Sequence, residues 1–218
     1  MAASKARVRA DGAEQETEAQ GGDALLTSLR HDIVFGAVAP GQWLRQSELE
    51  RRYGTSRAAI RRALADLESQ GLVEHRLNYG YRVAVVDAAQ RAQLCQVRVI
   101  LETGALPMIL ERVSPDDLDG LRGLASAFEQ AIEHGGRPQQ VASNFAFHRR
   151  FYELSGNRPL EALIRHQRER ADQGSTGRWQ TVSGLRGASA EHFAMLDALE
   201  ARDLERLGEL VRVHIERF

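Results

Sequence analysis

The segment from Pro40 to Val83 constrains the fold more than any other part of this 218-residue chain. Its pattern predicts two short helices joined by a tight turn at Gly54, followed by a hairpin whose tip is residues 78–80. Ser56 stands where a side chain can cap the second helix, and Gly71 stands where that helix can end. This order of elements is typical of a winged helix-turn-helix, a fold that places its second helix in a groove of DNA.

The start of the second helix carries the side chains that reading DNA requires. Arg57 and Arg61 are four residues apart and therefore share one face of the helix. Arginine is the usual reader of guanine because its guanidinium reaches both O6 and N7. Ala58 is small enough to let the helix approach DNA closely. The predicted DNA-binding residues of this helix are Ser56, Arg57, Ala58 and Arg61. The alternative is a solvated helix face, which would be the better interpretation of two arginines outside this pattern.

Residues 25–85 resemble the GntR family of bacterial transcription regulators. Four motifs carry the resemblance: Pro-Gly-x-x-Leu from residue 40, Ser-Arg-x-x-Ile-Arg-x-Ala-Leu from residue 56, Leu-x-x-x-Gly-Leu-Val from residue 67 and Gly-Tyr-x-Val from residue 80. The partner that this resemblance implies is double-stranded DNA.

The resemblance also implies two contacts outside the second helix. The wing tip is expected to reach the minor groove, and its residues are Asn78, Tyr79 and Gly80. The family usually has a basic residue where Ser47 stands in this chain. That contact is therefore expected either to be missing or to be replaced by Arg45 or Arg51.

Composition divides the chain into three parts. Residues 1–23 contain too few apolar side chains to offset the entropy of folding, so we predict a disordered tail. Residues 24–86 form the predicted DNA-binding domain, and residues 88–218 form a predicted all-helical domain. Residues 24–85 carry a net charge of +3, whereas the parts before and after them each carry −2. The positive charge therefore coincides with the DNA-binding pattern.

After Asp87 the apolar residues recur with the period of a helix. We therefore predict a mainly α protein, in which an N-terminal winged helix-turn-helix precedes a C-terminal all-α antiparallel helical bundle. Pro107 falls inside the first long helix of the bundle and is expected to kink or split it. Residues 173–190 are rich in glycine, serine and threonine, so we expect a weakly helical segment or a loop there.

Three histidines of the helical half have the spacing of a joint site. If the last two helices are antiparallel around a turn near residue 201, His192 and His214 lie about one helical turn apart in height. Asn144 precedes His148 by four residues, so the two share a helix face. Three neutral imidazoles and one oxygen ligand suit Zn, Ni, Mn or Fe in the +2 state.

Residues 90–218 resemble the FCD ligand-binding domain, the all-helical sensor of the FadR-type GntR subfamily. The residues that carry this resemblance are Arg98-x-x-x-Glu102, Asn144-x-x-Phe-His148, Ser155-Gly-Asn157, Glu191-His192 and the final helix from Asp203 to His214. Many members with this pattern hold a divalent metal with one aspartate and three histidines and bind a small organic acid beside it.

The second resemblance implies both the metal and the effector residues of this chain. The implied metal ligands are Asn144, His148, His192 and His214, with Asn144 at the position of the usual aspartate. A small carboxylate is expected to complete the coordination of the metal, and Arg98 is expected to pair with that acid. The neutral Asn144 oxygen removes one negative charge from the site, so metal affinity should be lower than with aspartate.

Two alternatives remain open for the histidine cluster. The first is a metal-dependent hydrolase, for which Glu191 beside His192 is the only close general acid or base; adjacent helix residues face apart. The second is a regulator whose histidines only pack or bind the effector directly, without a metal.

The remaining features bear on the compartment and the assembly. No apolar run approaches the ~20 residues of a membrane span. Cys95 is the only cysteine, so an internal disulfide is excluded and a reducing cytoplasm is expected. One recognition helix reads few base pairs, so we expect a homodimer on a near-palindromic operator.

Overall fold

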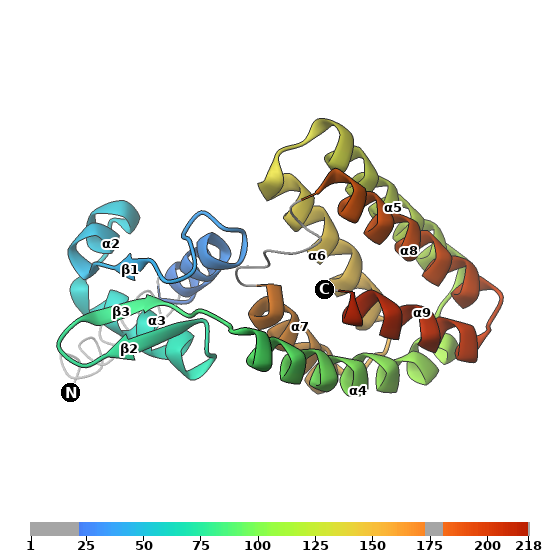
Figure 1. Cartoon of the computed structure of the whole chain (residues 1–218), viewed down its shortest axis with the longest axis horizontal. Coiled ribbons are helices and arrows are strands. Elements are labelled where there is room, and N and C mark those ends of the chain that lie inside the picture. Colours follow the sequence, from blue (N-terminus) through green and yellow to red (C-terminus); the bar gives the residue numbers. More distant parts are fainter. Residues whose placement is uncertain (1–21, 173–180, 218) are drawn as a thin grey trace, which may run out of the picture. The chain divides into compact units, whose positions relative to one another are not determined.

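The computed structural model describes residues 22–172 and 181–217 (Figure 1). The chain forms two compact units that divide between Val85 and Val86. Residues 1–21 of the predicted tail lie outside the described residues, whereas residues 22 and 23 already belong to the first helix.

The N-terminal unit combines helices with a small antiparallel sheet. Its elements are a helix over residues 22–34, β1 (Trp43–Leu44), α2 (Gln46–Tyr53), α3 (Arg57–Ser69), β2 (Val73–Arg76) and β3 (Gly80–Val83). The three strands are ordered β1-β3-β2, and Leu44 pairs with Tyr81. Leu29, Ile60 and Leu64 are fully buried in the core of this unit. The predicted winged helix-turn-helix is confirmed, with β1 as an additional strand.

Local backbone signals fix the turns of this unit. Gly54 ends α2 in the left-handed conformation (φ 60°), which glycine adopts without a steric penalty. The Ser56 hydroxyl accepts a hydrogen bond from the Ala59 amide at 3.3 Å and so caps α3. The hairpin tip turns at Asn78 (φ 66°) and Gly80 (φ 97°), as expected of a wing.

The C-terminal unit is an all-helical bundle. Its helices are α4 (Ala88–Arg112), α5 (Pro115–His134), α6 (Arg137–Glu153), α7 (Arg158–Asp172), α8 (Val182–Glu200) and α9 (Leu204–Glu216). α5 packs against α6 and α8, and α4 packs against α7 and α9 (Figure 1). The predicted mainly α fold class is therefore confirmed.

The structure narrows two expectations about this bundle. Pro107 does not split α4, which continues to Arg112. Pro107 lacks the N–H that would bond to the Thr103 carbonyl, but Leu106 and Ile109 are buried on either side of it and hold the helix in place. Residues 182–190 are helical, because α8 begins at residue 182, although residues 173–180 lie outside the described part.

The early start of α8 has a packing cause. Leu185 and Ala188 are buried against Phe128 and Ile132 of α5. The Thr181 hydroxyl accepts from the Gly184 amide at 3.0 Å and caps the helix. Tertiary burial thus outweighs the weak helix propensity of a glycine- and serine-rich segment. Within the described ranges, no helix is long and apolar enough to cross a membrane.

Candidate functional site

The N-terminal end of α3 presents the predicted base-reading side chains to solvent. Ser56, Arg57, Ala58 and Arg61 are all exposed. Arg57 Nε donates to Gln46 Oε1 at 3.2 Å, which ties the first residue of α3 to the first residue of α2. Arg45 is also exposed and stands directly before α2. The N-terminal unit thus places these predicted DNA contacts around the ends of two successive helices.

The wing tip is supported by an aromatic stack that the sequence did not reveal. The Tyr79 side chain is 78% exposed, and its ring stacks on Trp43 of β1 at a centroid distance of 5.9 Å. The Arg82 guanidinium also lies over the Trp43 ring, 5.8 Å from its centroid. Asn78 is exposed beside Tyr79 at the turn. Trp43 therefore orients the wing rather than filling the core.

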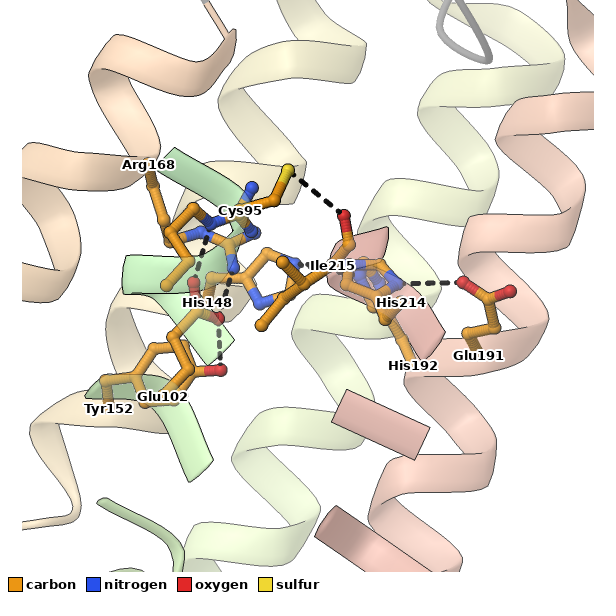
Figure 2. Close-up of polar contacts among 10 residues, drawn as sticks. Cys95, Glu102, His148, Tyr152, Arg168, Glu191, His192, His214 and Ile215 are labelled. Carbon is orange, nitrogen blue, oxygen red and sulfur yellow. Dashed lines mark hydrogen bonds and ion pairs between the residues drawn. The ribbon is translucent and has the colours of Figure 1, made fainter. Parts of the chain in front are cut away.

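The three histidines of the helical unit converge on one point. His148 Nε2 of α6 lies 3.1 Å from His192 Nε2 of α8 and 3.2 Å from His214 Nε2 of α9 (Figure 2). All three side chains are buried. The predicted proximity of His192 and His214 is therefore seen in the geometry, and three possible ligand atoms lie within 4.8 Å of one another.

Glu191 orients one of these imidazoles. His214 Nδ1 lies 2.9 Å from Glu191 Oε2, and Glu191 Oε1 accepts from Arg217. A neutral His214 that donates from Nδ1 keeps the lone pair of Nε2 for the centre of the triad. A carboxylate behind a histidine in this way is the usual second-layer support of a metal ligand. The expectation that Glu191 faces away from the cluster holds for His192 but not for His214.

The pKa values keep the triad neutral. Burial is the largest cause that lowers the pKa of His148, His192 and His214 below 6.5. The positive charge of Arg168 lowers the pKa of all three further, while Glu191 opposes this effect at His214. Neutral imidazole is the form that binds metal ions.

Asn144 brings an oxygen to the same region. It is 1% exposed and lies one turn before His148 on α6. Among the described residues, its Oδ1 atom has no hydrogen-bond partner, and neither does Nδ1 of His192. A buried acceptor beside three imidazole lone pairs is costly unless a cation or donor satisfies it. These residues therefore fit a divalent metal.

Arg98 lies in a buried ionic network beside the triad. Arg98 Nε donates to Glu102 Oε1 at 2.8 Å, while Arg168 Nη1 and the Tyr152 hydroxyl donate to Glu102 Oε2 at 2.7 and 2.5 Å. Burial alone would raise the pKa of Glu102, but the two arginines and these hydrogen bonds lower it to about 2. Glu102 is therefore a carboxylate. Arg168 and Tyr152 were not singled out from the sequence, because no local spacing connects them to Glu102.

Two families match the two units. The FCD domain family matches residues 93–217, and the family described as bacterial regulatory proteins, gntR family, matches residues 23–83. The chain belongs to the GntR family of transcriptional regulators and carries an FCD domain. These families consist of regulators rather than enzymes, so the hydrolase hypothesis is rejected.

Known relatives agree with this assignment. The chain is 27% identical over 179 residues to the HTH-type transcriptional regulator McbR of Escherichia coli, which covers 81% of each protein. It is also 27% identical over 143 residues to the uncharacterized regulator YdhC of Bacillus subtilis, which covers 65% of this chain and 64% of YdhC. The solved structure of E. coli McbR/YncC has a TM-score of 0.82 at 25% identity, covering 90% of this chain and 93% of that one.

Proposed function

We propose that this GntR-family regulator controls DNA binding through a small carboxylate that binds beside a divalent metal in the FCD domain. The observation that carries the proposal is the convergence of three buried Nε2 atoms, from His148, His192 and His214, at separations near 3 Å. Three lone pairs that face one another repel unless a proton or a cation lies among them. A divalent metal removes this repulsion and uses all three atoms.

The donor set limits the choice of metal. The proposed ligands are His148, His192, His214 and the Oδ1 atom of Asn144. Nitrogen ligands with one neutral oxygen suit Zn, Ni or Mn in the +2 state. When bound, the metal supplies an open coordination position for an exchangeable carboxylate oxygen. Arg98, the effector residue implied by the resemblance, is buried nearby in the network of Glu102.

The DNA-binding part of the proposal rests on the exposed ends of α2 and α3. Arg57 and Arg61 read bases in the major groove, and Ser56 and Ala58 lie at the same helix end. The wing tip reaches the minor groove, and Tyr79 is held there by Trp43. The protein acts in the cytoplasm as a homodimer on a near-palindromic operator.

Metal analysis combined with two substitutions tests the sensor. Purified protein incubated with excess Zn²⁺, Ni²⁺ or Mn²⁺ and then desalted should retain about one metal ion per chain, whereas His192→Ala should retain none. Asn144→Asp should tighten metal binding by roughly tenfold, because it restores a negative charge, which corresponds to about 1.4 kcal/mol. His134→Ala is the matched control, because the His134 side chain is 80% exposed on α5.

The same samples distinguish the metal-free alternative. A thermal-shift screen of small organic acids should find ligands that stabilise the metal-loaded protein and change its affinity for operator DNA. If the wild-type protein takes up none of the three metals, and His192→Ala still responds to an acid, the metal site is wrong and the histidines serve packing.

A further inference from the structure

Arg168 of α7 carries an unsatisfied buried donor in the region of the histidine triad. Its side chain is buried, at 4% exposure, and Nη1 donates to Glu102 Oε2 at 2.7 Å. Its Nε atom is also buried, yet it has no hydrogen-bond partner among the described residues. A buried guanidinium N–H without an acceptor is costly, so it indicates an acceptor that arrives from outside the chain.

The Glu102 carboxylate is shared by three donors. Arg98 and Arg168 share this one carboxylate, and the Tyr152 hydroxyl donates to it as well. Three donors therefore share one carboxylate, while the buried Nε atom of Arg168 stays unsatisfied. A further acceptor is expected there, and a carboxylate oxygen is the strongest acceptor for a guanidinium group.

The positive charge of Arg168 acts on the triad. Figure 2 shows Arg168 and Glu102 on the His148 side of the three histidines, opposite Glu191. Besides burial, the Arg168 charge is the one cause that lowers the pKa of each imidazole.

We propose that Arg168 binds the second acidic group of a dianionic effector, a short dicarboxylate, whose first acidic group lies at the histidine centre. This inference rests on the proposed function, in which a carboxylate binds at that centre. The ligands of the centre are all neutral, since Asn144 stands in place of an acid. A metal charge of +2 together with the unsatisfied guanidinium donor of Arg168 favours a ligand with two negative groups over one with a single group. The planar fork of arginine suits a carboxylate.

The structure also offers a variant that removes the Arg168 guanidinium without leaving Glu102 unpaired. In Arg168→Met, Glu102 keeps its ion pair with Arg98 and its hydrogen bond from Tyr152. The variant is therefore expected to fold. Arg168→Lys keeps the charge but loses the planar fork. Arg165→Met is the control on the same helix, since its side chain is 47% exposed and pairs with Glu161.

Calorimetric titration with simple acids tests the proposal. Oxalate, malonate, succinate and glutarate are the dianionic probes, and acetate is the monoanionic probe. The full-length protein is loaded with whichever metal it takes up, or is used without metal if it takes up none. The wild-type protein and Arg165→Met should bind at least one dianion about 10- to 100-fold more tightly than acetate, the size of a hydrogen bond to a charged group. Arg168→Met should lose this preference but keep its acetate affinity and metal content, and Arg168→Lys should lie between the two.

The outcomes separate this inference from the metal proposal. Arg168-dependent binding of a dianion to a protein that takes up no metal supports Arg168 and refutes the metal. Normal metal uptake with no dianion preferred over acetate overturns the inference and leaves the metal site standing. Wild-type dianion affinity in a folded Arg168→Met variant also overturns it.

Discussion

The side chains of the histidine centre are all uncharged. His148, His192 and His214 are buried, and each has a pKa lowered below 6.5, chiefly by burial. Asn144 adds an uncharged oxygen where the resemblance implies an aspartate. Three neutral imidazoles and one amide would bring no negative charge to the proposed divalent metal, which favours the proposed anionic effector as the group that neutralises it.

Neutral buried histidines make the stability of the metal-free protein depend on pH. The unfolded chain binds protons at each of these histidines near pH 6.5, whereas the folded chain does not until a lower pH. The contribution of these histidines to the free energy of unfolding is therefore fully present above pH 6.5 and decreases as the pH falls. Each histidine contributes up to about 1.4 kcal/mol per pH unit.

Urea unfolding of EDTA-treated protein at pH 7.5 and pH 5.5 measures this effect. We expect the free energy of unfolding to be lower at pH 5.5 by at least about 1 kcal/mol. His192→Gln should reduce the difference, whereas the exposed control His134→Ala should leave it unchanged. Equal stability of the wild-type protein at the two pH values would show that the triad is protonated or open to solvent in the folded state.

Among the elements, α7 connects the sensor to the start of α4. Arg168 lies near the end of α7, and three residues later the Ala171 carbonyl accepts a hydrogen bond from Arg91 Nη1 at 3.1 Å. Arg91 belongs to the first turn of α4, which follows β3 after only four residues. The last carbonyls of a helix have no partner inside the helix, so this bond also satisfies the end of α7. If the proposed ligand moves Arg168, we expect this bond to transmit the movement to α4, the helix that leads to the DNA-binding unit.

Substitution of Arg91 should separate ligand binding from its effect on DNA. Arg91→Ala should retain metal and the acid found in the thermal-shift screen with affinities within about threefold of wild type, a change below about 0.7 kcal/mol. The ratio of the operator affinities measured with and without the acid should approach one. Fluorescence anisotropy with labelled operator, with and without the acid, measures the ratio. Arg149→Ala is the control, because Arg149 is exposed and pairs only locally with Glu153 among the described contacts. An unchanged ratio in Arg91→Ala would rule out this route.

Elements that depend on residues close together in the sequence could be predicted, whereas contacts between distant residues could not. The winged helix-turn-helix could be predicted because its turns depend on local residues, such as Gly54 and the Ser56 cap. The triad could be anticipated because two antiparallel helices fix the relative heights of His192 and His214. Arg168 could not be found in this way, since it reaches Glu102 across 66 residues of sequence. Tertiary contacts determine both the position of Arg168 beside Glu102 and the start of α8.

At the scale of the whole molecule, charge and connection assign separate roles to the two units. The net charge of +3 is confined to residues 24–85, whereas the buried charges of the sensor lie in the C-terminal unit. Only residues 84–87 join β3 to α4, so α4 is the direct covalent route between the wing and Arg98. We therefore expect an effector bound in the C-terminal unit to change DNA affinity through α4, without touching DNA itself.

We expect the protein to bind its operator as a homodimer. A single α3 helix contacts only a few base pairs, and a two-fold pair of such helices doubles the site and requires two half-sites related by symmetry. We expect light scattering at micromolar concentration to give the mass of a dimer of 24.2 kDa chains. The operator should be near-palindromic, and deletion of one half-site should weaken binding strongly. Arg57→Ala should weaken operator binding by about 1–3 kcal/mol and relax the preference for one base pair in both half-sites equally. A monomer that binds the operator with full affinity would contradict this assembly. An equal loss on specific and nonspecific DNA in Arg57→Ala would make Arg57 a phosphate contact instead.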